Sequence, residues 1–422
     1  MKILWITNFV LHSSGLGGSK KVLSGTWLEA MLRILTLDDG IELHVGMFAG
    51  RSSPPQTTDG INYYWIKATR QFFSYKSNFR MRKTIEELIE TVSPDIVHIQ
   101  GTEFPRCEAV IDSCRKRNIK VIASIQGLIS VISNYYLAEV SAAEWLRRSS
   151  FRDFLLGYTI PRQAYFCRMR GEAERSMIIK LDAVLGRTDW DRAHVREIAP
   201  ETDYFHSPEL LRPEFYNNKW ILNQTPVLLT GNMSSPLKGL HTILRALKLL
   251  QRDYPEIKLR IIGENLYEPS KFKRKLIKKS YINYISRLIE NLRLNDCVEW
   301  LGPCNAEQII AAMNSSSIYI QASSIENSPN SLIEALQIGM PVVASGVGGT
   351  LNMLEHGKDG FIYRSGDEAL LSYYVSKLLG SKSLLKQFSE YSYNKNRARL
   401  SSGKASCSSL LDIYSGLING GR

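Results

Sequence analysis

The sequence predicts an α/β protein with two doubly wound domains, and three observations support this fold class. The 422 residues exceed the length that one hydrophobic core usually organises, because cores tend to split beyond about 250–300 residues. Short, nearly continuous apolar runs alternate with amphipathic helical patterns, as in parallel sheets that helices cover on both faces. A segment that contains Pro208, Pro213 and Pro226 separates two such series.

The first half of the chain opens with a strand, a glycine loop and a helix, the order found in nucleotide-binding units. KILWIT at residues 2–7 is typical of a short buried strand, a glycine loop at residues 15–18 follows, and a helical pattern covers about residues 20–35. Strands and helices then alternate. Further strands are expected at residues 42–48, 61–66, 95–99, 120–125 and 182–185, and helices at residues 84–92, 105–117 and 191–198.

The second half repeats this alternation, which sets the expected domain boundaries. We expect domains at residues 1–207 and 226–385, a connection at residues 208–225, and C-terminal helices at residues 386–422 that can pack back on the first domain. Because ligands bind beyond the carboxyl ends of strands in open α/β sheets, two domains facing each other would place a site in the cleft between them. The strands of the second series are expected at residues 226–230, 257–262, 298–301, 318–321 and 341–344.

The composition is that of a soluble globular chain, with 44% hydrophobic and 22% charged residues. Polar residues interrupt the longest apolar candidate for a membrane span, residues 121–132, and Asn8 and His12 interrupt the apolar N-terminus, so neither an integral membrane helix nor an export signal is expected. The cysteines lack zinc-site spacing, and we expect reduced thiols in a cytoplasmic protein. They are Cys107, Cys114, Cys167, Cys297, Cys304 and Cys407.

A formal net charge of +12 favours anionic partners, which include nucleotides, lipid head groups and nucleic acid. The densest basic cluster is KFKRKLIKK at residues 271–279, and aromatic residues follow it. A second basic stretch at residues 147–175 also carries Phe151, Phe154 and Tyr165, side chains that can enter a membrane interface. The charge therefore fits a solvated helix face, a nucleic-acid-binding protein, or a peripheral protein at an anionic inner membrane surface.

The richest motif is SSIENSPNSLIEALQIGMPVVASGVGGTLNMLEHGKDGF at residues 323–361. A proline between the two glutamates is expected to open a helix, so that Glu326 lies in the preceding loop and Glu334 about a turn and a half into the helix. Both carboxylates can then reach one ligand from different depths. The amides near Ser331 and Leu332 are expected to be free N–H donors at the helix N-terminus, which suits a diphosphate.

This motif resembles the donor site of the retaining family-four glycosyltransferases, which have two Rossmann-like domains and the type B (GT-B) fold. The resemblance rests on the Glu-x7-Glu spacing, the following A-L-x-x-G-x-P-V-V-A-S-x-V-G-G and the later G-x-x-G-F. It implies that Glu326 faces the donor sugar and that Glu334 holds the ribose hydroxyls. It also implies that residues 1–207 form the acceptor side and residues 226–385 bind the nucleotide sugar, across a cleft.

The stretch TGNMSSPLKGLHTILRAL at residues 230–247 is similar to the family's strand, phosphate loop and helix. By this resemblance Lys238 places its ammonium group on the donor diphosphate, where it can stabilise leaving-group charge. Asn232 stands near the position where the family often has an arginine, so that Lys238 is expected to act with backbone amides.

The first domain carries weaker matches to the same family. GLGGSKKVL resembles the glycine loop that lies against the donor phosphates, with Gly17 and Gly18 as the contact positions. Gln126 precedes a glycine where many relatives have a histidine, and a neutral amide can hydrogen-bond but cannot shuttle a proton. Glu103 lies in a loop after an expected strand, where it can face the acceptor, whereas His98 on that strand is typical of a hydrogen-bonded core histidine.

Together these features predict a retaining hexosyltransferase that uses a nucleoside-diphosphate sugar and a glycan or lipid-linked acceptor in polysaccharide biosynthesis. No Asp-x-Asp triplet is present, so we expect no essential metal and no cofactor besides the nucleotide sugar. A sugar-nucleotide epimerase of the same fold is the enzymatic alternative. A basic nucleic-acid-binding protein is the alternative from another class, although no nucleic-acid-binding module accompanies the charge, so we expect no nucleic-acid partner.

Overall fold

The structure is a computed structural model. The contacts within the chain divide it into two compact units. Unit 1 comprises Met1–Val131, Arg168–Arg212 and Leu400–Arg422, and unit 2 comprises Ile132–Cys167 and Pro213–Arg399. The structure describes residues 1–11, 26–50, 53–68, 79–149, 151–207, 210–231, 233–265, 280–397 and 399–420.

Unit 1 is built on an eight-stranded sheet with the order β3-β4-β2-β1-β5-β6-β7-β8. All neighbouring strands are parallel except β3 and β4, which form an antiparallel hairpin at one edge. This is the doubly wound arrangement that the sequence predicts. The strands are β1 (Lys2–Thr7), β2 (Glu42–Ala49), β3 (Gln56–Thr58), β4 (Ile61–Lys67), β5 (Ile96–Gln100), β6 (Lys120–Ser124), β7 (Ala183–Gly186) and β8 (Asp203–His206).

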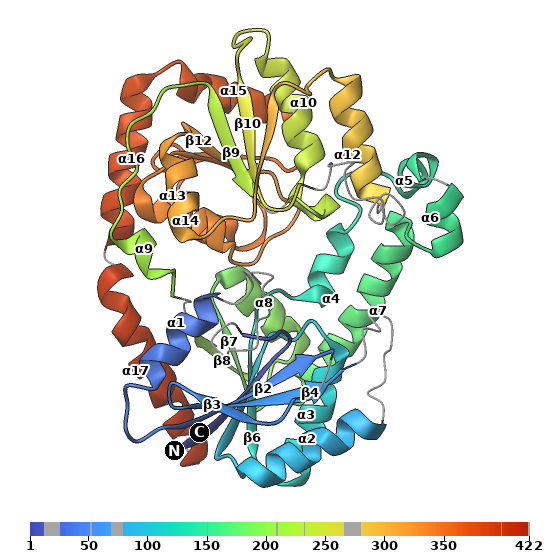
Figure 1. The fold of residues 1–422 in the computed structure, drawn as a ribbon, viewed down its shortest axis with the longest axis vertical. Helices are drawn as coiled ribbons and strands as arrows, with labels where there is room; N and C mark the ends of the chain where they lie inside the picture. Colours follow the sequence, from blue (N-terminus) through green and yellow to red (C-terminus); the bar gives the residue numbers. More distant parts are fainter. Residues whose placement is uncertain are drawn as a thin grey trace. The chain divides into compact units, whose positions relative to one another are not determined.

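Alternate side chains of the strands feed two hydrophobic cores, one on each face of this sheet. On β1, Ile3 and Trp5 join the core that contains α1 and α17, whereas Leu4 and Ile6 join the core that contains α2, α3 and α8. Figure 1 shows helices on both faces. The helices are α1 (Thr26–Leu35), α2 (Phe79–Val92), η2 (Pro105–Cys107), α3 (Glu108–Lys116), α4 (Ile129–Ile132), α7 (Ile160–Ile178), α8 (Asp189–Ile198) and α17 (Arg399–Ile418), of which α4, α7 and α17 cross the division between the units.

Helix α17 is fixed to unit 1 by Tyr414, which is fully buried. Its hydroxyl accepts a hydrogen bond from Trp5 Nε1 at 3.0 Å and lies 2.6 Å from His98 Nδ1. The other ring nitrogen of His98 lies 2.8 Å from Ser124 Oγ, and burial lowers the pKa of His98 to about 3. His98 is therefore a neutral core residue of the sheet.

Unit 2 contains a six-stranded, entirely parallel sheet with the order β11-β10-β9-β12-β13-β14. All its strands are short, and β12 and β13 are wholly buried, which explains why these two stand out in the sequence as apolar runs. The strands are β9 (Val227–Gly231), β10 (Lys258–Ile262), β11 (Val298–Gly302), β12 (Ile318–Gln321), β13 (Val342–Ser345) and β14 (Gly360–Tyr363).

Helices cover both faces of the second sheet (Figure 1), and the larger core lies under α10, α12 and α15. Trp145 of α5 enters this core and contacts the rings of His241, Tyr281 and Tyr284 edge-on. The helices are η3 (Ser133–Tyr135), α5 (Ala142–Arg148), α6 (Phe151–Leu156), α9 (Pro213–Tyr216), η4 (Pro236–Lys238), α10 (Leu240–Leu250), α12 (Ser280–Asn291), α13 (Ala306–Asn314), α14 (Asn330–Ile338), η5 (Gly348–Asn352), α15 (Glu368–Leu379) and α16 (Lys382–Arg397).

The two units differ from the expected domains in three segments. Residues 386–399, expected among the separate C-terminal helices, belong to unit 2, and the other two segments carry large aromatic side chains. Ile132–Cys167 was expected in the first domain, yet it belongs to unit 2, where Trp145 packs into the core of that unit. The expected connection at residues 208–225 contains Trp220, which is buried in unit 2 and donates from its indole nitrogen to the carbonyls of Met313 and Ser316 at 3.1 Å. Burial of large aromatic side chains decides both assignments.

Candidate active site

The strand order of the second sheet reverses between β9 and β12, which lie side by side although they are far apart in the chain. The loops that follow such a pair diverge at their carboxyl ends and leave a place for a ligand. Lys238 follows β9 and Glu326 follows β12. The fold thus brings two of the predicted site residues to one edge of the sheet.

Lys238 and Glu326 form an ion pair at this edge, with 2.5 Å between Nζ and Oε1. Ser323 Oγ donates to the same oxygen at 2.7 Å. The Lys238 side chain is 31% exposed and that of Glu326 is 13% exposed, so both heads lie at the boundary with solvent. A cation and a carboxylate in contact here can meet the phosphate and the hydroxyl groups of one ligand.

Backbone contacts hold the two loops together. Gly239 has φ of 69°, and a Cβ atom at this position would lie 1.8 Å from the carbonyl oxygen of Ala322 at the end of β12. The amide of Ser324 also donates to the carbonyl of Leu237 at 2.8 Å. The glycine of the predicted Lys-Gly pair is therefore required for close packing of the two loops, since glycine permits this φ and this approach without a clash.

Glu334 lies within α14, where its residue is buried to 7% exposure, in agreement with the expected depth. Pro329 precedes the helix as its N-cap. The expectation for Leu332 was wrong, because its amide donates to the carbonyl of Pro329 at 3.0 Å and is not free. Ser331 is the second residue of the helix.

Tyr319 of β12 belongs to this site, and the sequence reasoning missed it. Its side chain hydrogen-bonds with Ser331, and burial, together with the nearby Glu326 and Glu334, raises its pKa. Both carboxylates therefore lie near the buried ring of Tyr319, whose phenol is neutral. In the sequence this residue is a tyrosine inside an apolar strand. Such a tyrosine is more often a core residue, so it does not indicate a site.

Glu139 is a second residue that the sequence reasoning missed. Its carboxylate accepts hydrogen bonds from Ser324 Oγ at 2.7 Å and from Ser365 Oγ at 2.8 Å. Ala138 and Glu139 both have left-handed φ values, 51° and 59°, which non-glycine residues seldom adopt. Glu139 therefore links the loop that carries Glu326 to two other segments of unit 2. No sequence pattern predicts these hydrogen bonds.

In unit 1, Glu103 and Gln126 lie together beyond the carboxyl ends of β5 and β6. A Cβ atom on Gly101 would lie 2.4 Å from Glu103 Oε2 and 3.3 Å from Gln126 Cγ, so both side chains press on this glycine. Arg187 donates to the Gln126 side-chain oxygen at 3.2 Å, and Arg170 donates to the backbone carbonyl of Glu103. The structure thus brings together the two predicted site residues of unit 1 that it describes.

Glu103 is an ionisable group of this edge whose pKa is raised. Burial of its carboxylate raises its pKa to about 7, and the neighbouring Glu174 adds to this increase, whereas Arg170 and Arg187 oppose it. Glu174 is itself fully buried and accepts hydrogen bonds from Thr102 Oγ1 and from Ser130. Burial thus raises the pKa of both carboxyl groups.

Three predicted site residues, Gly17, Gly18 and Asn232, lie outside the described residues, as does the basic cluster at residues 271–279. Among the residues that the structure describes, no group of three histidine, cysteine or acidic side chains could hold a metal ion. In the same residues no helix is long and apolar enough to cross a membrane. The described cysteines are thiols that form no disulfide with one another, namely Cys107, Cys114, Cys167, Cys297 and Cys304.

Solved structures of GT-B glycosyltransferases align with this chain over nearly its whole length, so the chain has the GT-B fold. The sucrose-phosphate synthase from Thermosynechococcus elongatus aligns with a TM-score of 0.76 over 99% of this chain and all of that one, at 14% identity. HepE from Anabaena, solved in complex with UDP-glucose, aligns with a TM-score of 0.64 over 98% of this chain and all of that one, at 13% identity.

The sequence of most of the second unit matches one family model. Residues 214–395 match the model of the glycosyl transferases group 1. An uncharacterized glycosyltransferase of Haemophilus influenzae is 24% identical over 213 residues, which are 50% of this chain and 53% of that protein. The chain thus spans about half or less of the length of the first curated relatives that it matches.

Proposed function

We propose that the chain is a retaining glycosyltransferase that moves a hexosyl group from a nucleoside-diphosphate sugar to a glycan or lipid-linked acceptor in polysaccharide biosynthesis. The observation that carries the proposal is the Lys238–Glu326 pair at the strand-order reversal of a group 1 glycosyltransferase domain. Glu334, in the middle of the adjacent helix α14, is the third residue of this proposed site.

Lys238 is proposed to bind the donor diphosphate. Its ammonium group is partly exposed and lies immediately before α10, whose N-terminus adds positive potential at the same place. Negative charge develops on the diphosphate as the bond to the sugar breaks, and a cation already in place stabilises that charge. We infer that the reaction proceeds without a metal or a cofactor, because these protein groups supply the positive charge.

Glu326 and Glu334 are proposed to hold the two ends of the donor. Glu326 can accept hydrogen bonds from sugar hydroxyls, and Glu334 can accept two hydrogen bonds from the vicinal ribose hydroxyls. Retention then follows if the acceptor hydroxyl attacks from the face that the diphosphate leaves. In this mechanism the protein mainly positions the reactants and stabilises charge.

The acceptor and the location of the enzyme are proposed from unit 1 and from the composition. Glu103 and Gln126 are the side chains that we assign to the acceptor hydroxyl. The described cysteines form no disulfide with one another, which fits a reducing compartment. We place the enzyme in the cytoplasm, peripheral to the inner face of the membrane, where a basic chain meets anionic lipid.

The test is incubation of the full chain with a panel of UDP-, GDP- and ADP-sugars, in line with the UDP-glucose bound by the HepE structure. We expect slow release of nucleotide from one donor and faster release when acceptor is added, unchanged by a metal chelator. Nuclear magnetic resonance of the product should show the anomeric configuration of the donor.

Other outcomes would contradict parts of the proposal. Interconversion of donor sugars without nucleotide release would identify an epimerase, and an inverted anomeric centre would exclude retention. A chelator that abolishes transfer would exclude the metal-independent mechanism. No binding of any nucleotide sugar by calorimetry would remove the transferase assignment altogether.

A further inference from the structure

Helix α6 exposes its apolar side chains and buries its acid, the reverse of an ordinary surface helix. Phe151 is 85% exposed, Phe154 is 51% exposed and Leu155 is 75% exposed. Their spacing of three and four residues places them on one helix face. On the same helix Asp153 is only 2% exposed. An apolar face of this kind on a short helix is typical of a surface that meets an apolar partner.

A basic pocket of about 290 Å³ lies beside this helix, between α5 and α12 of unit 2. Only two residues separate Arg148, at the end of α5, from Phe151. Figure 1 shows α5 and α6 next to each other at the side of α12. The lining residues are Glu144, Arg147, Arg148, Tyr284, Arg287, Leu288 and Asn291.

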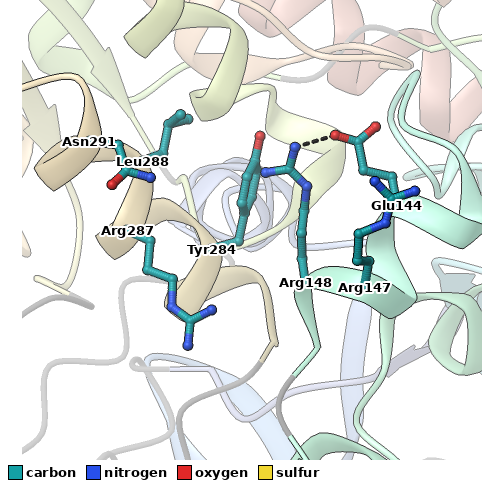
Figure 2. Close-up of a pocket in the computed structure, with 7 residues that line it drawn as sticks. All are labelled: Glu144, Arg147, Arg148, Tyr284, Arg287, Leu288 and Asn291. Atoms are coloured by element: carbon teal, nitrogen blue, oxygen red, sulfur yellow. Dashed lines mark hydrogen bonds and ion pairs between the residues drawn. The ribbon is translucent and has the colours of Figure 1, made fainter.

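The arginines of the pocket are not equivalent. Arg148 is engaged, because it pairs with Glu144 and its guanidinium lies 4.5 Å from the centre of the Tyr284 ring, as Figure 2 shows. Arg147 and Arg287 are exposed and have neither an ion pair nor a hydrogen bond to another residue that the structure describes. Three guanidinium groups against one carboxylate leave the pocket with an excess of two positive charges.

We propose that α6 and this pocket form a docking surface for an anionic lipid bilayer. Phe151, Phe154 and Leu155 would enter the interfacial region, and the pocket would take the phosphate of a lipid head group between Arg147 and Arg287. Arg147 and Arg287 would provide the long-range attraction to the leaflet. This surface is distinct from the Lys238–Glu326 site, and its assignment does not depend on the proposed transferase activity.

Charge complementarity favours a bilayer, and not a second copy of the chain, as the partner of this surface. Two copies meeting through this surface would bring together six arginines and only two glutamates, because each pocket has three guanidinium groups and one carboxylate. An anionic bilayer instead offers phosphate groups and an apolar interior within a few ångströms of each other, which matches a basic pocket beside an apolar helix face.

The experiment is sedimentation of the full chain with phosphatidylcholine vesicles that do or do not contain phosphatidylglycerol, at low and high salt. We expect binding only to the vesicles with phosphatidylglycerol and weaker binding at high salt. The double variant Arg147→Glu with Arg287→Glu and the double variant Phe151→Ser with Leu155→Ser should each lose about tenfold or more in vesicle affinity.

Two matched controls separate this surface from general effects. Arg252→Glu changes another exposed arginine of unit 2, and Leu37→Ser changes a leucine that is 77% exposed, close to the 75% of Leu155. Both should bind vesicles like the unchanged protein, and all variants should keep its melting temperature. Nucleotide affinity should also be unchanged, so a failed transferase assay does not affect the result.

Three outcomes would overturn the proposal. The first is equal binding to neutral and anionic vesicles, and the second is full binding by both double variants. The third is a dimer in light scattering that the Phe151→Ser with Leu155→Ser variant abolishes while no vesicle binding is seen, because this would assign the apolar face to a second copy.

Discussion

The contact between Lys238 and Glu326 means that each charge already has a partner before any ligand arrives. A diphosphate at Lys238 would compete with the Glu326 carboxylate, since both are anions seeking one ammonium group. We expect ligand binding to release Glu326 toward the sugar hydroxyls, so that the ion pair exchanges for two ligand contacts. The net free-energy change of such an exchange is small, because like interactions replace each other.

Glu326→Ala should therefore abolish transfer without weakening nucleotide binding. Loss of a contact to the reacting sugar typically lowers kcat by about 100-fold or more, while Lys238, freed from its partner, remains available to the diphosphate. Turnover with the best donor and calorimetry with its free nucleotide measure the two effects. Glu390→Ala on α16, an exposed glutamate, is the control, and a Glu326→Ala enzyme of normal turnover would refute the assignment.

Glu334→Gln should weaken binding of nucleotide and of nucleotide sugar alike. The amide keeps the shape of the side chain but loses the charge that strengthens two hydrogen bonds to ribose, a loss of about 1–3 kcal/mol. KM should rise with little change in kcat, and the melting temperature without ligand should stay the same. A lowered melting temperature with normal nucleotide affinity would instead make Glu334 a structural residue of α14.

At the scale of secondary structure, Glu139 joins the loop after β12 to the segment before α15. It touches no reacting group in our proposal and acts through Ser324, so we class it as a positioning residue. The left-handed backbone at Ala138 and Glu139 is strained for both residues, and the surrounding contacts must maintain it.

Glu139→Ala should lower kcat by about tenfold, since removal of two serine contacts loosens the loop that carries Glu326. Glu139→Gln retains an acceptor oxygen and should recover most of the activity. Nucleotide affinity should change little in either variant. If Glu139→Ala and Glu139→Gln were equally impaired, the negative charge and not the position of the loop would be responsible.

The sequence predicts the buried strands well and the edge elements poorly. β1 and β12 coincide with the expected ranges because strands buried on both faces appear as unbroken apolar runs. β8 has only partly buried or exposed residues and was missed. The helix α6 was not predicted, although Phe151 and Phe154 were expected to enter a membrane interface. Its apolar residues face outward, so a pattern that assumes apolar burial does not apply to it.

The sequence likewise predicts some features of the candidate site and not others. The two motifs predict that Lys238 and Glu326 each follow a strand and that Glu334 lies in a helix, because strand, loop and helix follow one another within each motif. They do not predict that Lys238 and Glu326 touch, nor that the Leu332 amide is occupied by Pro329. Glu139 could not be found at all, since its role depends on a contact between distant segments.

At the scale of the whole molecule, the raised pKa of Glu103 couples folding to pH. The folded protein holds this proton up to about pH 7, whereas the unfolded chain releases it near pH 4.5. The folded state is therefore favoured below pH 4.5, and this contribution to the free energy of unfolding is lost as the pH rises to 7. Its magnitude is at most about 3 kcal/mol, because part of the residue reaches solvent.

Glu103→Gln should remove this dependence. We expect the variant to gain stability relative to the unchanged protein between pH 5 and 8, with the difference shrinking toward pH 4.5. Urea unfolding followed by circular dichroism at several pH values measures it. A difference that does not vary with pH would show that Glu103 has an ordinary pKa, and Glu201→Gln, at an exposed site of unit 1, serves as the comparison.

The approach of Gly239 to the carbonyl of Ala322 also has an evolutionary consequence. A mutation to any other amino acid would need a simultaneous shift in the end of β12, because the added atom would overlap a backbone oxygen that no side-chain substitution can remove. A single nucleotide change at this codon cannot be rescued by another at position 322, since every amino acid carries the same carbonyl. Among descendants of this gene, the glycine should therefore persist even where lineages have diverged in the sugars that they use.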